Sequence, residues 1–320
     1  MKKTNFKNSA FRNPLNDILG SKGHILILRE LITLDIPINY AELIERTNLS
    51  RQGLYDVVDR LIETGALMHV GIGKQKLIQL RTDHPLSESI INLFTKEKKL
   101  YHSLLKELKE VIKNLDKQPK SAWIFGKIAQ GTDEYGDPVQ VAILGDMKSI
   151  DIITENFREK LYHSGIEQNY DITIDLRGIT KADLETRSKL MEGNIILLYG
   201  VDPRSYLENL NKSGTQKRKK HTDFDARSLS DAEIWTKLLK KYPEIISKTL
   251  NHLENRIPQV SSGERKELQE WKHILESMSF QRLKKFLESD SERSVRLRQS
   301  LPFWEVLNER ERSELMNTSK

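Results

Sequence analysis

Residues 48–65 read NLSRQGLYDVVDRLIETG, and this stretch decides the fold of the first part of the chain. Ser50 is a good N-cap, because its hydroxyl can accept a hydrogen bond from the first turn of a helix. The apolar residues after it recur at helical spacing, at Leu54, Val57, Val58, Leu61 and Ile62. Gly65 stands where a helix C-cap is expected. The stretch therefore predicts an amphipathic helix between Ser50 and Gly65.

The flanking sequence extends this pattern in both directions. Apolar residues at helical spacing precede it, at Ile25, Leu28, Leu31 and Ile32, and Asn39 is a plausible N-cap for a short helix before Asn48. Two strand-like runs follow, at about 67–70 and 77–81, with a basic hairpin between them. This order of helices, turn, helix and strand hairpin over residues 20–84 resembles the winged helix-turn-helix domains of bacterial transcription regulators.

The resemblance implies a set of DNA-binding residues. The start of the recognition helix would meet base edges in the major groove, with Arg51 on guanine, Gln52 on adenine and Tyr55 on phosphate or a thymine methyl. Lysines of the wing would touch the DNA backbone or minor groove. The residues expected to bind double-stranded DNA are Ser50, Arg51, Gln52, Tyr55, Lys74 and Lys76.

The charge of this domain is nearly balanced. Residues 20–82 hold eight basic and seven acidic side chains, and the whole chain has a formal net charge of +6. Affinity would therefore depend on a basic N-terminal arm at residues 1–19, on the wing and on duplication of the site in a homodimer. The alternative is that the winged helix serves only as a protein-interaction module.

The next segment predicts a long helix. Apolar residues recur in steps of three, four and seven from Leu86 to Leu115, within a connecting segment placed at residues 85–118. Such a helix either pairs with a second copy of the chain or packs within its own chain.

Residues 119–202 alternate between strand-like and helix-like runs, which predicts a small α/β domain. Strands are expected at about 122–125, 139–144, 170–176 and 195–199, and helices near 148–164 and 180–191. The segment resembles the minimal nucleotidyltransferase domain of the DNA polymerase β superfamily. In that family a Gly-Ser turn cradles a triphosphate, and three carboxylates hold two Mg²⁺ ions.

The catalytic pattern of that family is incomplete in this chain. Gly126 stands at the Gly-Ser position with Lys127 in place of the serine, and Asp137 is retained while Val139 replaces the second carboxylate. The third acid would be Asp171 or Asp175, which four-residue spacing would put on one face of a strand. We therefore expect no catalysis and no cofactor, and a vestigial nucleotide or metal site at Gly126, Lys127, Asp137 and Asp175.

The remaining sequence predicts a basic linker at residues 203–228 and a helical region at residues 229–320. In that region Phe303 and Trp304 dock on the chain's own helices, or the tail that contains them docks on a partner or on nucleic acid. The sequence contains no cysteine and no apolar run long enough to cross a bilayer, so a cytoplasmic protein without membrane contact is expected. The fold class is thus multidomain and mainly α with α/β.

Taken together, these patterns predict a DNA-binding regulator whose middle domain binds a ligand or a protein partner. Two alternatives remain. The first is an antitoxin of a toxin–antitoxin pair, which would co-purify with a small partner. The second is a working nucleotidyltransferase, which would need Mg²⁺.

Overall fold

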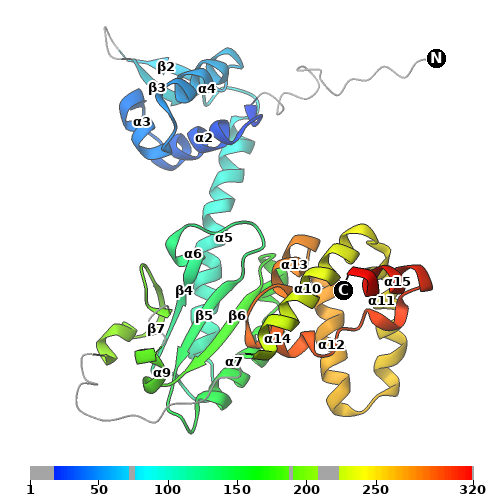
Figure 1. The fold of residues 1–320 in the computed structure, drawn as a ribbon. Coiled ribbons are helices and arrows are strands. Elements are labelled where there is room, and N and C mark those ends of the chain that lie inside the picture. The colour runs from blue at the N-terminus through cyan, green and yellow to red at the C-terminus, as the bar shows by residue number, and fades with distance from the viewer. Residues whose placement is uncertain (1–17, 72–75, 187–189, 208–222, 319–320) are drawn as a thin grey trace, which may run out of the picture. The chain divides into compact units, whose positions relative to one another are not determined.

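The computed structural model describes residues 18–71, 76–186, 190–207 and 223–318 (Figure 1). It is a mixed α/β structure with one three-stranded and one four-stranded sheet. The chain divides into two compact units, one up to Ser103 and one from Leu104 onward.

The first unit contains short helices and a small antiparallel sheet in the order β1-β3-β2. Its elements are α2 (Lys22–Leu34), β1 (Ile38–Asn39), α3 (Tyr40–Thr47), α4 (Arg51–Glu63), β2 (Leu67–Val70) and β3 (Leu77–Leu80). The helices and strands predicted over this segment are all present within a few residues of the expected bounds.

Local hydrogen bonds explain where these helices begin. The side chains of Ser21, Asn39 and Ser50 accept hydrogen bonds from the backbone of the first turns of α2, α3 and α4. This confirms the predicted N-caps Asn39 and Ser50. The inward face of α4 is fully buried, at Leu54, Val58 and Leu61.

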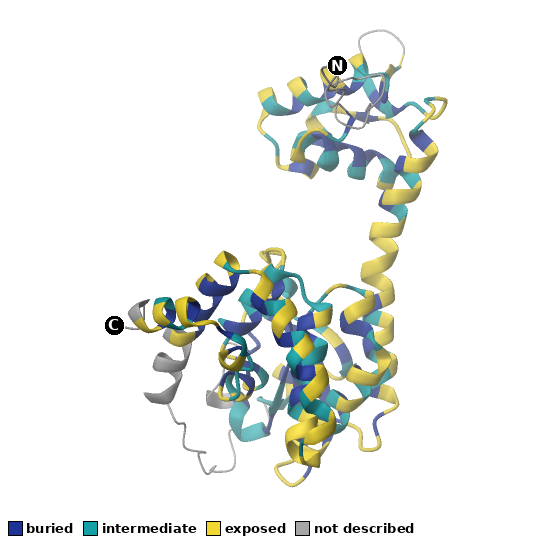
Figure 2. Cartoon of the chain, turned by 90° about the vertical axis from the view of Figure 1, so that its right-hand side faces the viewer, coloured by how far each residue is buried: buried dark blue, intermediate teal, exposed yellow. Residues whose placement is uncertain are grey.

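Helix α5 (Ser87–Lys113) is the predicted long helix. Its first turns contribute Ile90 and Phe94 to the core of the first unit, and its last turns contribute Leu108 and Ile112 to the core of the second. Its middle is exposed, as Figure 2 shows. Two apolar side chains at the predicted helical spacing, Leu93 and Leu100, therefore lie at the surface.

The second unit is built on a mixed sheet in the order β6-β5-β4-β7, in which only β5 and β6 are parallel. Its strands are β4 (Ser121–Phe125), β5 (Val139–Leu144), β6 (Ile174–Ile179) and β7 (Ile196–Gly200), and the helices between them are α6 (Gly126–Gln130), α7 (Ile150–Ser164), α8 (Ile166–Asn169) and α9 (Lys181–Thr186). One face of the sheet packs on α5 and α7, through side chains such as Ile124, Val141 and Phe157.

The C-terminal part of this unit is helical. A 3-10 turn η2 (Pro203–Tyr206) precedes it, and its elements are α10 (Asp223–Lys241), α11 (Glu244–Arg256), η3 (Ile257–Gln259), α12 (Ser262–Ser277), α13 (Phe280–Leu287), α14 (Glu292–Arg298), η4 (Trp304–Val306) and α15 (Glu309–Thr318). Trp271 and Phe303 are fully buried at its centre, with ring centroids 5.8 Å apart, whereas Trp304 is exposed. Docking of Phe303 on the chain's own helices is thus confirmed for that residue.

Two predictions of the elements were wrong in detail. The third strand begins at Ile174 and not near 170, because Asp171 adopts a left-handed backbone conformation with φ of 51° in the turn before it. The linker predicted at residues 203–228 was too long, because η2 and α10 occupy its two ends. Residues 208–222 between them lie outside the described residues. Helix α9 covers Lys181–Thr186 of the helix expected near 180–191, and residues 187–189 lie outside the described residues.

No helix among the described residues is both long enough and apolar enough to span a membrane.

Candidate functional site

The start of α4 presents polar side chains to solvent. Ser50 accepts a hydrogen bond of 3.2 Å from the Gly53 amide, and Arg51 and Gln52 are exposed in the first turn. Gln52 donates to the Asp56 carboxylate one turn later, at 2.7 Å. This turn therefore presents an exposed guanidinium and an amide whose donor is already engaged by its own helix.

Tyr55 is half-buried and stacks on a second tyrosine. Its ring stacks on the ring of Tyr40, with centroids 4.5 Å apart and planes inclined by 14°, and the Arg51 guanidinium lies 5.8 Å from its centroid. Tyr40 in turn lies 3.0 Å through its hydroxyl from Nε2 of His69 on β2. Burial, and after it the Asp59 carboxylate, raise the pKa of Tyr40 above its ordinary value. Sequence reasoning missed Tyr40 and His69, because only the fold brings them to Tyr55.

The expected wing residues are described only in part. Lys76 is exposed immediately before β3. Lys74 and the N-terminal arm up to residue 17 lie outside the described residues.

A pocket of about 310 Å³ lies in the second unit, where the end of β4 and the start of β5 meet α13. Its lining residues are Lys127, Asp137, Pro138, Gln140, Lys285, Glu288 and Ser289. Gly126 begins α6 beside it with φ of 74°, where any side chain would be strained and would also meet the Gln140 side chain. The backbone therefore favours glycine there, which agrees with its expected position at a tight turn.

Asp137 is held by cations at this pocket. Lys285 donates to it at 2.8 Å, Lys127 at 3.3 Å and the Glu134 amide at 2.9 Å. Burial alone would raise the pKa of Asp137, but the hydrogen bonds from Lys285, Glu134 and Lys127 outweigh burial and hold it below its ordinary value. Lys127 lies in the first turn of α6.

Asp175 lies on the adjacent strand in a buried setting. The parallel register pairs it with Gln140, so both side chains lie on the same face of the sheet. Burial raises the pKa of Asp175 to about 6, although Arg177, 3.5 Å away, and the Gln140 side chain act to lower it. Arg177 is shared with Asp290, at 2.8 Å. The Oδ1 atom of Asp175 is buried without a hydrogen-bond partner among the described residues.

The predicted carboxylates do not form one cluster. Asp171 and Asp175 do not share a strand, because Asp171 lies in the turn and pairs with Arg282. Val139 points into the core on the opposite face of the sheet from Asp175. Since Asp137 is neutralised by two ammonium groups and Asp175 faces Arg177, these residues do not fit a site for two Mg²⁺ ions. The described residues hold no group of three or more acids and histidines placed to ligate a metal.

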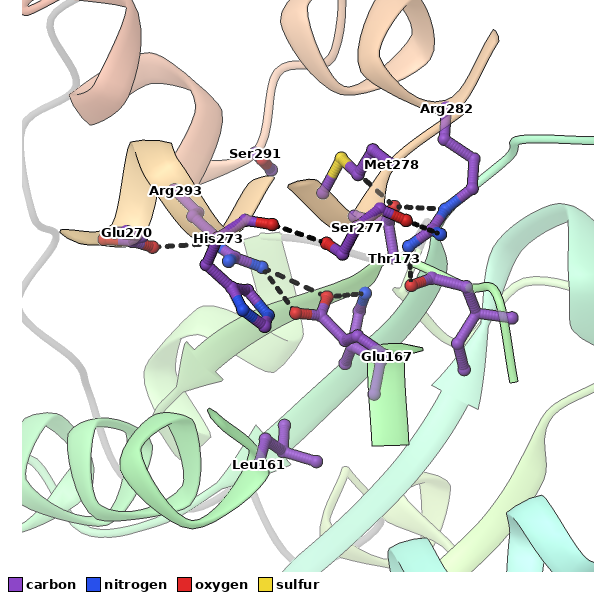
Figure 3. A network of polar contacts seen from close by, with 12 residues as sticks. Leu161, Glu167, Thr173, Glu270, His273, Ser277, Met278, Arg282, Ser291 and Arg293 are labelled. Atoms are coloured by element: carbon purple, nitrogen blue, oxygen red, sulfur yellow. Dashed lines mark hydrogen bonds and ion pairs between the residues drawn. The ribbon is translucent and has the colours of Figure 1, made fainter. Parts of the chain in front are cut away.

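Two arginines of the C-terminal helices, Arg282 and Arg293, bind the turn before β6 and helix α8 (Figure 3). Arg282 of α13 is 1% exposed and donates to Asp171, to the Ile172 carbonyl and to the Ser277 carbonyl at 3.1 Å. Arg293 of α14 bridges Glu167 at 3.1 Å and Glu270 at 2.8 Å. One signal for Arg282 was present in the sequence, because it falls on the apolar stripe of α13 with Leu283, Phe286 and Leu287.

In comparisons with known proteins, no protein-family model, no curated protein and no solved structure matches the chain.

Proposed function

We propose that this chain is a cytoplasmic DNA-binding transcription regulator that acts as a homodimer through a winged helix-turn-helix in its first unit. One observation carries the proposal: α4 begins with an exposed Arg51 and Gln52 above a fully buried inner face, next to a two-stranded hairpin. A helix anchored in this way can enter the major groove with its first turn while the hairpin lies beside the groove.

The acidic residues of α4 limit how the helix can contribute. Asp56, Asp59 and Glu63 are exposed on it and oppose the phosphate backbone. The helix would therefore read bases through Arg51, while the phosphate contacts come from other parts of the chain and from the second protomer.

Fluorescence anisotropy with the DNA upstream of the gene, and with a random duplex of equal length, tests the proposal. At two salt concentrations, selective binding that weakens with salt supports it. Arg51→Ala is expected to cost about 1–3 kcal/mol on the specific duplex and little on the random one. Arg60→Ala, which removes an exposed arginine from the last turn of α4, is the matched control. Equal binding of both duplexes by the wild type would instead favour a protein-interaction module.

We infer a second role for the second unit. Its pocket would be a ligand site on a degenerate nucleotidyltransferase-like domain. The supporting observation is the charged lining of the pocket, where the ammonium groups of Lys127 and Lys285 flank Asp137. An ammonium group binds phosphate as a point charge, so these lysines are candidate contacts for a nucleotide phosphate. Thermal shift with nucleotides, with and without Mg²⁺, tests this role, and labelled nucleotides test for transfer. Asp137→Ala would abolish transfer if the chain were an active enzyme.

A further inference from the structure

Four side chains of the first unit form one continuous row across three elements. The row begins at Arg51 on α4, passes through Tyr55 and Tyr40, and ends at His69 on β2. Each neighbour is in direct contact: a guanidinium 5.8 Å from a ring centroid, two stacked rings 4.5 Å apart, and a hydroxyl 3.0 Å from an imidazole nitrogen. The row thus joins the first turn of α4 to α3 and to the hairpin.

The row is separate from the hydrophobic core below it. Arg51 and His69 are exposed and the two tyrosines are half-buried, whereas the core under α4 is formed by other, fully buried residues. Packing alone does not require these side chains, because an aliphatic residue would cover the same surface. What a rigid stacked pair adds is a fixed π face next to a flexible cation.

We propose that Tyr55, supported by Tyr40 and His69, is a positioning residue that orients the Arg51 guanidinium for base recognition. This inference rests on the proposed DNA-binding function and deepens it by naming what sets the specificity. A free arginine samples many rotamers, and a guanidinium held over a ring loses fewer of them when it forms a bidentate pair with guanine.

The hydroxyl of Tyr40 secures the far end of the row. The Tyr40 hydroxyl lies 3.0 Å from His69 Nε2, within hydrogen-bonding distance. This contact joins the Tyr40 ring to β2 on the side away from α4 and favours its stacked position on Tyr55. This indirect role is the alternative to the expected direct contact of Tyr55 with phosphate or a thymine methyl.

A double-mutant cycle separates the indirect role from a direct contact. Arg51→Ala is expected to weaken binding to the preferred duplex about tenfold to a hundredfold, and Tyr55→Leu about two- to fivefold. If Tyr55 acts through Arg51, the double variant binds no more weakly than Arg51→Ala alone. If Tyr55 touches DNA by itself, the two losses multiply.

The experiment uses the full chain and a duplex that the wild type selects from a random-sequence pool, with anisotropy on that duplex and on a random one. Tyr55→Phe, which keeps the stack, should restore wild-type affinity within about twofold. Tyr162→Leu, at an exposed tyrosine of the second unit, is the matched control. Should Tyr55→Leu fail to fold, Tyr40→Leu at the first residue of α3 removes the stack from its other side and enters the same cycle.

The outcomes distinguish the inference from the function on which it rests. A pool from which the wild type selects no sequence overturns both. Selective binding with a non-additive cycle and rescue by Tyr55→Phe supports the inference. Selective binding with multiplied losses, or with an equal loss on the random duplex, overturns the positioning role and leaves the proposed function standing.

Discussion

Lys285 Nζ lies 2.8 Å from Asp137 Oδ1, and this ion pair joins α13 to the segment that leads into β5. The Asp137 side chain is 7% exposed and the Lys285 side chain 23% exposed, so water screens the pair only in part. A lysine from the C-terminal helices therefore lies directly beside the Asp137 carboxylate. The pocket is lined by residues of both β5 and α13.

Replacing Lys285 with methionine should destabilise the second unit more than the same change at Lys127. Both lysines hold Asp137, but the Lys127 side chain is 59% exposed and its distance is longer, at 3.3 Å. We expect a loss of about 1 kcal/mol in the free energy of unfolding for Lys285→Met and less than about 0.5 kcal/mol for Lys127→Met. Urea denaturation of both variants checks this order. Equal losses would mean that Lys285 contributes no more than a surface pair.

Local signals made the helices and their caps predictable from the sequence. Asn39 and Ser50 bond to amides three residues ahead, so the pattern is complete within a few positions. Lys285 carries no such signal, because Asp137 is 148 residues away. Its role follows only from the packing of α13 on the sheet.

The acidic residues of the second unit also have partners that the sequence alone does not predict. Asp171 and Asp175 have the spacing of one strand face, but the turn at Asp171 separates them. The partner of Asp175 on the neighbouring strand is Gln140, and this depends on the parallel register of β5 and β6. Spacing along the chain does not determine the register between strands. The resemblance put the position of the second carboxylate at Val139, whereas the register of β5 and β6 pairs Gln140 with Asp175.

Arg282 should be among the most sensitive residues of the C-terminal region. Arg282→Met leaves the carbonyls of Ile172 and Ser277 without their donor and leaves Asp171 without this cation. We expect a loss of about 2–3 kcal/mol in the free energy of unfolding. Arg296→Met, at a half-exposed arginine that pairs with Glu270, is the matched control and should cost less than about 1 kcal/mol. A loss for Arg282→Met no larger than that of Arg296→Met would contradict the role of Arg282 in fastening α13 to the turn before β6.

Asp175 should make the protein less stable as the pH rises from about 4 to about 6. Its pKa is raised to about 6 in the folded chain, so the folded state binds a proton that the unfolded state has released. This cost is absent below the ordinary pKa of an aspartate and complete above pH 6. An asparagine side chain mimics the neutral acid. The free energy of unfolding of Asp175→Asn, relative to that of the wild type, should therefore rise by about 2 kcal/mol from pH 4.5 to pH 7.5.

Asp137 provides the control of opposite sign. Its pKa is lowered, so its stabilising contribution is present above the ordinary aspartate pKa and is lost as the pH falls through its lower folded value. Asp137→Asn should therefore be less stable than the wild type at pH 7.5. Thermal unfolding of Asp175→Asn at pH 4.5 and 7.5, and of Asp137→Asn at pH 7.5 and below pH 3.8, measures the two signs. A pH-independent difference between Asp175→Asn and the wild type would show that burial of this carboxylate costs nothing.

The exposed leucines Leu93 and Leu100 indicate that two copies of the chain pair through α5. They are 55% and 45% exposed on α5 and lie seven residues apart, which is two turns on one face and the spacing of paired helices. They line an apolar pocket of about 480 Å³ in the first unit together with Leu19, Ile25, Phe94, Lys96 and Glu97. A second copy of α5 would cover both leucines at once, whereas a lysine at either position would place a charge between the two helices.

The double variant Leu93→Lys/Leu100→Lys should therefore sediment as a monomer at concentrations where the wild type sediments as a dimer. It should also bind a duplex with two half-sites at least about tenfold more weakly. Ile152→Lys, which adds the same charge at an exposed apolar residue of α7, should leave the dimer intact. A wild type that stays monomeric at micromolar concentration, or a double variant that still dimerises, would rule out this face of α5 as the dimer interface.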